Sequence, residues 1–178
     1  MCVIQVNDKS FWKLIPEAQI KEQVGRVANE INRDYVGEKP VFLSVLNGAF
    51  IFAADLIREV SLPCEISFVK VSSYQGTSST GKIQELIGLN MDIKGRHVVV
   101  VEDIIESGLT MKHLLDMLLE QHPASLQVCA LLQKPNRLQV ELDVKYCCFR
   151  IPDDFIVGYG LDYNEEGRNL KDIYSLVK

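Results

Sequence analysis

The segment 98–110, VVVVEDIIESGLT, combines acidic and small polar residues directly after an apolar run. Its four valines predict a strand that is buried on both faces of a parallel sheet. Glu102 and Asp103 follow the valines, and the small polar stretch 107–110 precedes an apolar pattern that is typical of a helix. The start of a helix offers unpaired N–H groups to a phosphate, and adjacent carboxylates bind sugar hydroxyls or a cation such as Mg²⁺. The segment therefore favours a site for a sugar phosphate.

Strands of this kind also occur in other parallel α/β proteins, so the segment alone leaves alternatives open. Phosphate-receiver domains and Walker-B strands likewise place Asp or Glu at the end of an apolar strand. The sequence contains neither GxxxxGK[ST] nor GxGxxG. A P-loop or a dinucleotide-binding site therefore lacks its main support.

The rest of the chain alternates strand patterns with helical patterns. Helices are predicted at 16–35 and 49–60, and a third helix is predicted to follow Thr110. A polar loop is predicted at 74–82. Strands are predicted at 41–46, 65–72, 85–89, 98–101, 126–132 and 144–149, and two short apolar pieces lie at 157–159 and 173–176. This alternation predicts an α/β fold with a mostly parallel sheet. We expect a single domain, 1–178, whose terminal segments form a small flap.

The composition is that of an ordinary globular protein, with 47% hydrophobic residues, 24% charged residues and a net charge of −5. The acidic balance and the lack of a basic run disfavour a protein that coats nucleic acid. No apolar run reaches the length of a membrane span, and the first residues lack the layout of a signal peptide, so we expect a cytoplasmic protein without a membrane partner. The five cysteines include no CxxC pair, which favours free thiols over disulfides.

The segment 98–110 closely resembles the phosphoribosyl-pyrophosphate motif of the type I phosphoribosyltransferases: an apolar strand, two acids, two apolar residues, a further acid, and Ser-Gly-x-Thr. From about Leu43 onward the chain is similar to the hypoxanthine-guanine phosphoribosyltransferases within that family. The resemblance implies a five-stranded, mostly parallel sheet flanked by helices, with a small hood over the base site. It also implies Mg²⁺ as a cofactor, a purine base and phosphoribosyl pyrophosphate as small-molecule substrates, and a homodimer or homotetramer.

The resemblance assigns the central motif to the sugar phosphate. Glu102 and Asp103 would face the ribose hydroxyls, directly or through Mg²⁺. Glu106 stands where close relatives usually have an aspartate that takes the proton from the purine N7, so it would be the general base. The 5′-phosphate would be held by Ser107, Gly108, Leu109 and Thr110.

Two further turns are expected at the edge of the sheet where the parallel strands end. Asn47-Gly48 follows the strand 41–46, and its glycine lets the backbone approach an anion. The family has a pyrophosphate-binding turn here, often with a non-proline cis peptide, although many relatives have Lys-Gly. Ser73 and Tyr74 open the polar loop, which in relatives folds over the reaction centre as a lid.

The remaining implied roles concern the purine and the departing pyrophosphate. Lys134 would donate to the 6-oxo group of the base, which selects hypoxanthine or guanine over adenine. Phe155 would stack on the purine, and the carbonyl of Ile156 would meet its N1/N2 edge. Asp162 would bind Mg²⁺, and Arg168 would grip pyrophosphate. A xanthine-preferring or pyrimidine enzyme, and an RNA-binding regulator built on the same fold, remain open alternatives.

Overall fold

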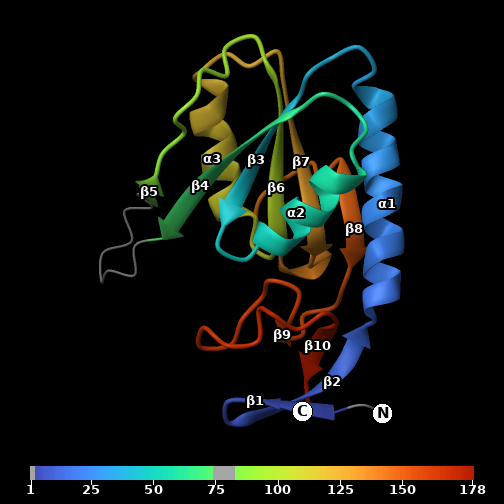
Figure 1. Ribbon diagram of the computed structural model, residues 1–178. Coiled ribbons are helices and arrows are strands. Elements are labelled where there is room, and N and C mark those ends of the chain that lie inside the picture. Colours follow the sequence, from blue (N-terminus) through green and yellow to red (C-terminus); the bar gives the residue numbers. More distant parts are fainter. Residues whose placement is uncertain (1–2, 74–82) are drawn as a thin grey trace.

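A six-stranded sheet lies at the centre of the molecule (Figure 1). The computed structural model describes residues 3–73 and 83–178. In the order β5-β4-β3-β6-β7-β8, the strands are Ile83–Ile87, Glu65–Ser73, Val41–Leu46, His97–Ile105, Ser125–Gln133 and Tyr146–Arg150. All neighbours from β4 to β8 are parallel, whereas β5 is antiparallel to β4. The expected five-stranded parallel core is therefore confirmed, with one antiparallel strand added at its edge.

Helices cover both faces of this sheet, with α1 and α2 on one face and α3 on the other (Figure 1). Their bounds are Glu17–Asp34 for α1, Phe50–Glu59 for α2 and Leu109–Leu119 for α3. The apolar stripe of α1 is buried at the spacing seen in the sequence: Ile20, Val24, Val27 and Ile31. Within the described ranges no helix has the length and apolarity that crossing a membrane requires.

The four valines of β6 serve both apolar layers. Val98 and Val100 pack with α3, and Val99 and Val101 pack with α1 and α2. All four are fully buried. A strand that is covered on both faces has no polar side, which explains the uninterrupted apolar run in the sequence.

Strand β6 is longer than the sequence predicted. We expected it to end at Val101, with the acids beyond it, but pairing with β7 continues through Glu102 and Ile104 to Ile105. Ile105 is buried in the layer under α3, and its burial stabilises the continuation of the strand. The acid pair therefore lies on regular strand backbone, and the turn begins only at Glu106.

A second sheet, here called the hood, joins the two ends of the described chain (Figure 1). It consists, in order, of β1 Val3–Val6, β2 Lys9–Ile15, β10 Ile173–Leu176 and β9 Ile156–Val157, all antiparallel. The last two fall on the short apolar pieces near the end of the sequence, whereas the first two were not predicted. The turn between β1 and β2 places Asn7 at a φ of 51°, a left-handed conformation that asparagine tolerates.

Candidate active site

The predicted site residues gather at the carboxyl edge of the six-stranded sheet. Asn47 follows β3, Glu106 follows β6 and Lys134 follows β7. The segment from Phe155 to Arg168 comes after β8 and leads into and beyond β9 of the hood. Ligands of parallel α/β sheets bind at this edge, so the placement agrees with a binding site built from several strand ends.

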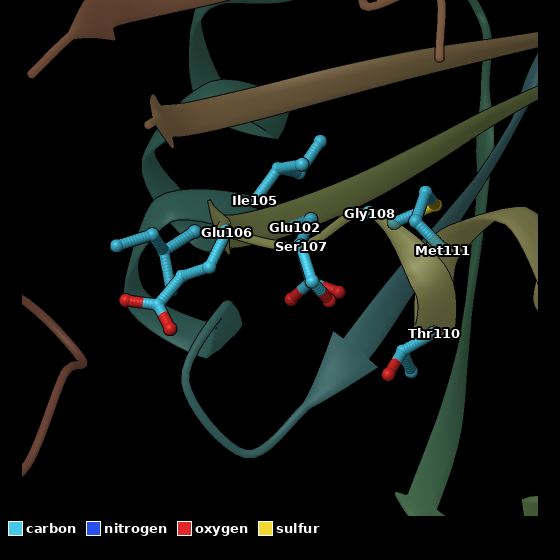
Figure 2. Close-up of a pocket in the computed structure, with 8 residues that line it drawn as sticks. Glu102, Ile105, Glu106, Ser107, Gly108, Thr110 and Met111 are labelled. Carbon is cyan, nitrogen blue, oxygen red and sulfur yellow. The ribbon is translucent and has the colours of Figure 1, made fainter. Parts of the chain in front are cut away.

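A pocket of about 250 Å³ opens at the end of β6. Figure 2 shows that Glu106 and Thr110 lie at opposite ends of it, with Ser107 between them. The pocket is lined by Glu102, Ile104, Ile105, Glu106, Ser107, Gly108, Thr110 and Met111. The structure thus brings together the residues that were predicted to hold a ribose 5′-phosphate, with the exception of Asp103 and Leu109, which do not line this pocket.

Gly108 shapes the turn that opens α3. Its φ of 76° is left-handed, and a Cβ added there would lie 3.1 Å from Val140 and 3.2 Å from Leu138. The N-cap residue has no side chain, and the N–H of Leu109, the first residue of α3, donates to Ser107 Oγ over 3.4 Å. A helix start of this kind has the N–H groups and the hydroxyl that suit a phosphate.

Glu102 and Asp103 are half-buried and interact with each other and with the strand backbone. The N–H of Asp103 donates to Glu102 Oε1 over 3.1 Å, and the N–H of Ile104 donates to Asp103 Oδ1 over 2.7 Å. Burial raises the pKa of Glu102, and the charge of Asp103 raises it further. Burial also raises the pKa of Asp103. Two crowded carboxylates of this kind favour hydroxyl donors or a cation beside them.

The turn after β3 is packed tightly against this acid pair. A Cβ on Gly48 would lie 1.6 Å from Asp103 Oδ2, and a Cβ on Gly160 would lie 2.1 Å from the carbonyl oxygen of Gly48. Gly160, with a φ of 103° and a backbone neighbour, therefore requires glycine, whereas a side chain at Gly48 would displace the Asp103 carboxylate. The peptide bond between Leu46 and Asn47 is cis, as the family resemblance implied. The proposed pyrophosphate turn, the acids and the 158–161 turn form one continuous surface.

Lys134 is buried at the end of β7, with 5% of its side chain exposed. Its ammonium group forms an ion pair with Glu106 and lies 3.5 Å from Asp153 Oδ1. The other oxygen of Asp153 lies 3.5 Å from Arg137 Nη1, in the 3₁₀ turn Pro135–Arg137. The proposed general base and the proposed purine-recognising lysine are therefore in direct contact.

Asp162 and Arg168 form a pair at the other side of the site. Arg168 Nη2 lies 2.7 Å from Asp162 Oδ1 and 3.1 Å from Glu165, and Nη1 donates to the carbonyl of Gly160 over 3.0 Å. The predicted metal ligand and the predicted pyrophosphate grip are thus brought together, although in this state they contact each other.

The proposed stacking residue Phe155 belongs to an aromatic cluster that includes the hood. Its ring centroid lies 5.7 Å from that of Tyr163 and 6.3 Å from that of Phe11. Lys9 Nζ lies 4.6 Å from the centre of the Tyr163 ring. Ile156 is buried in β9. Phe155 is 45% exposed, which leaves one side of the ring accessible to a ligand.

Ser73 is the last residue of β4, and Tyr74 lies outside the described residues. Sequence reasoning missed Lys9, Phe11, Arg137, Asp153 and Gly160 as contributors to the site. Asp153 and Gly160 stand inside the IPDDFIVGYGLDYNEEGRNL stretch that carried the resemblance, so that stretch was a signal. Lys9 and Phe11 reach the site only through the hood, which required the unpredicted hairpin.

Comparison with known proteins agrees with this geometry. Residues 15–164 match the phosphoribosyl transferase domain family. The hypoxanthine-guanine phosphoribosyltransferase of Streptococcus pneumoniae strain R6 is 42% identical over 158 residues, which is 88% of each chain. The hypoxanthine phosphoribosyltransferase of Salmonella typhimurium is 41% identical over 167 residues, which is 92% of this chain and 94% of the relative.

Solved structures are similar over nearly the whole fold. A hypoxanthine-guanine phosphoribosyltransferase from Bacillus anthracis has a TM-score of 0.88 and 46% identity, covering 94% of this chain and 97% of its own. A hypoxanthine phosphoribosyl transferase from Trypanosoma cruzi has a TM-score of 0.90 and 35% identity, covering 98% and 95%. Together with the strand-end turn, the acid pair and the buried lysine, these matches show that the chain belongs to the phosphoribosyltransferase family and has the type I fold.

Proposed function

We propose that the chain transfers the phosphoribosyl group of 5-phosphoribosyl 1-pyrophosphate to hypoxanthine or guanine, giving IMP or GMP and pyrophosphate, as a step of purine salvage. The observation that carries this proposal is the buried Lys134 in contact with Glu106, which lines the pocket at the end of β6. This contact supports a selective hydrogen-bond donor next to the proposed sugar-phosphate site. The names of the relatives support hypoxanthine and guanine as acceptors over xanthine or a pyrimidine.

In this proposal the pocket at the end of β6 binds the sugar phosphate. The 5′-phosphate accepts hydrogen bonds from the N–H groups of the turn and from the hydroxyls of Ser107 and Thr110. The ribose hydroxyls donate to Glu102 and Asp103. The lining of the pocket supports this order, since Glu102 lies on the strand and Ser107 and Thr110 lie at the helix start.

The pyrophosphate is assigned to the Asn47-Gly48 turn and to Arg168. The close approach of Gly48 to Asp103 and of Gly160 to Gly48 supports a shared binding surface for the sugar and its leaving group. Arg168 would exchange its contacts with Asp162 and Glu165 for phosphate oxygens, which suit its planar donors. Asn47 offers no positive charge where many relatives have lysine, so Arg168 would supply the cationic contact here.

The purine is assigned to the space between Phe155 and Lys134. Phe155 would stack on the base, the Ile156 carbonyl would accept from its N1/N2 edge, and Lys134 would donate to the 6-oxo group. A buried ammonium group has no acceptor to offer the 6-amino group of adenine, so adenine would leave it unpaired.

Glu106 is proposed as the general base. The N9–C1′ bond forms while the bond from C1′ to the pyrophosphate oxygen breaks, and that electron pair leaves with the pyrophosphate. The N7 proton of the base passes to the Glu106 carboxylate, which makes the attacking ring more nucleophilic. Ser73 and Tyr74 are proposed to open the lid that excludes water during this step.

The acidic side chains fit Mg²⁺ because their donors are oxygens alone. In the described ranges no three His, Cys, Asp or Glu residues form a metal cluster; Mg²⁺ commonly binds through one or two carboxylates together with substrate phosphates. Asp162, Glu102 and Asp103 would hold it. When bound, Mg²⁺ would neutralise charge on the pyrophosphate.

We further propose a single phosphoribosyltransferase domain, 1–178, that works in the cytoplasm as a homodimer or homotetramer, with small-molecule substrates and without membrane or nucleic-acid partners. The Trypanosoma cruzi relative was studied for the role of its C-terminal region in its oligomeric state, which supports a test of assembly here. Light scattering of the purified protein at several concentrations measures the mass of the assembly. A fit to a monomer alone would contradict the oligomer.

A panel of free bases tests the activity. Purified protein is incubated with phosphoribosyl pyrophosphate, Mg²⁺ and hypoxanthine, guanine, xanthine, adenine or uracil, and the nucleotide product is measured. We expect IMP and GMP and little product from the other bases. Product from xanthine alone would assign the alternative acceptor, and the absence of product from hypoxanthine and guanine would refute the proposal. RNA retention on filters with a steep salt dependence would support the RNA-binding alternative.

A further inference from the structure

The ammonium group of Lys134 lies between two carboxylates that come from different segments. Glu106 reaches it from the end of β6, and Asp153 reaches it from the segment between β8 and β9, 3.5 Å away. The lysine side chain is only 5% exposed, whereas Glu106 and Asp153 are each about half exposed. A buried cation therefore has two anionic partners, each of which is partly accessible to solvent.

The proposed reaction changes the charge of Glu106 but not that of Asp153. Glu106 takes the N7 proton and becomes neutral, so it no longer balances the charge of Lys134. An unbalanced buried charge costs several kcal/mol, and water has little access to this ammonium group. If Glu106 were the only anionic partner, accepting the proton would therefore be opposed by the lysine that holds the purine.

Asp153 has a second cationic partner that does not involve Glu106. Its second oxygen lies 3.5 Å from Arg137 Nη1. The segment that follows Arg137 is tied to the phosphate turn, because the N–H of Gln139 donates to the carbonyl of Ser107 over 3.0 Å. Asp153 thus belongs to the frame around the pocket and does not depend on Glu106.

We propose that Asp153 is a positioning residue for Lys134: it holds the ammonium group directed at the 6-oxo group while Glu106 is released to the purine N7. This inference rests on the proposed function. Asp153 touches neither the base nor the sugar in this scheme, and it acts only through Lys134. Its removal should therefore affect the purine and leave the sugar donor unaffected.

The test is the substitution Asp153→Asn, which keeps the shape and removes the charge. We expect kcat/KM for hypoxanthine to fall about tenfold, the effect of losing a charged partner, while KM for phosphoribosyl pyrophosphate changes by less than about twofold. Asp153→Glu restores a carboxylate and should recover most of the loss. A thermal melt of each variant separates this effect from unfolding.

The neighbouring carboxylate provides a matched control. Asp154 has the same charge but pairs with Lys178 over 2.9 Å, away from Lys134. Asp154→Asn should leave kcat/KM for hypoxanthine within about twofold of the parent protein, since the pair of Asp154 with Lys178 does not involve Lys134.

A crystal structure with bound IMP gives a second measurement. We expect Lys134 Nζ to lie within hydrogen-bonding distance of both the 6-oxo group and Asp153, with Glu106 turned toward N7. A lysine that leaves Asp153 in this complex would overturn the inference.

The kinetic outcomes separate this inference from the proposed function. A parent protein that makes no nucleotide from hypoxanthine refutes the proposed function and, with it, the inference. An active parent with an unchanged Asp153→Asn variant overturns the inference alone. So do equal losses in the two Asn variants, an equal rise in KM for both substrates, and the absence of recovery in Asp153→Glu.

Discussion

At Glu106 the length of one side chain decides what the carboxylate meets. With one methylene more than the aspartate usual in relatives, it extends to Lys134 and forms an ion pair with it. The extra methylene would also let the Glu106 carboxylate reach a purine nitrogen when the Glu106 backbone lies slightly further from the base. In the proposed reaction the lysine and the base would compete for the Glu106 carboxylate, so binding of the base would exchange one partner for the other.

The substitution Glu106→Gln removes the proton acceptor and keeps the size of the side chain. We expect kcat for IMP formation to fall by about 10²–10⁴-fold, the usual contribution of a general base, while KM for hypoxanthine and for the sugar donor changes little. Steady-state kinetics measure both. Glu106→Asp, which keeps a carboxylate, is the control and should retain more activity. Unchanged turnover in Glu106→Gln would remove Glu106 from this role.

At the scale of elements, the turn after β3 depends on the absence of a side chain. Gly48→Ala would place a Cβ 1.6 Å from Asp103 Oδ2. We expect the free energy of unfolding to fall by about 1–3 kcal/mol and KM for phosphoribosyl pyrophosphate to rise, because the Asp103 carboxylate must move. Urea unfolding and initial rates measure these effects.

Gly25→Ala is the matched control for that substitution. Gly25 lies inside α1, and a Cβ there has no neighbouring heavy atom within 4 Å among the described residues. We expect the same chemical change to raise the free energy of unfolding by about 0.5–1 kcal/mol, since alanine favours a helix. If both variants lose stability equally, the close packing of Gly48 is not the cause.

The elements that could be predicted from the sequence are those with strong local patterns. The strand β6 and the helix α1 can be recognised in the sequence. The valines of β6 form an uninterrupted apolar run, and the apolar stripe of α1 repeats at the helical period. The hairpin of β1 and β2 escaped prediction, because β1 has only four residues, β2 mixes charged and apolar residues, and β2 pairs with β10, far along the chain.

The site residues can also be divided into those that a local sequence pattern reveals and those that depend on distant segments. The phosphate turn and Glu102 could be recognised because one short segment carries them. The contact of Gly160 with Gly48 and that of Asp153 with Lys134 join distant segments. Local patterns contain no information about such pairs, so only the fold could reveal them.

At the scale of the whole molecule, Asp172 connects the hood to the main sheet. It pairs with Lys13 of β2 over 2.6 Å, accepts the N–H of Glu17 at the start of α1 over 2.8 Å, and accepts the hydroxyl of Tyr174 of β10 over 3.1 Å. The hydrogen bond from Lys13 is the main reason that the pKa of Asp172 lies below its ordinary value of 3.8, with the N–H of Glu17 and the Tyr174 hydroxyl also lowering it.

This lowered pKa predicts how stability depends on pH. Since the folded protein binds the proton less tightly than the unfolded chain, Asp172 stabilises the fold above pH 3.8 and loses that contribution as the pH falls further toward its folded pKa. We expect Asp172→Asn to be less stable than the parent at about pH 7 and to lose less stability between about pH 5 and about pH 3.

Urea unfolding across that pH range measures the difference. Asp116→Asn is the control, because Asp116 forms only an exposed pair with Lys112 one turn away on α3, which contributes a few tenths of a kcal/mol. Parallel acid profiles for the parent and Asp172→Asn would contradict the assignment.

The position of β2 between β1 and β10 has a consequence for biosynthesis. A ribosome delivers every strand of the six-stranded sheet before β10 leaves the exit tunnel, and a lone two-stranded hairpin is marginal in water. In the nascent chain, the backbone groups of β2 that pair with β10 therefore remain unpaired until Leu176 has emerged from the ribosome. A translation product that stops before β10 would contain the catalytic edge of the sheet without the wall that Phe11 helps to build beside Phe155.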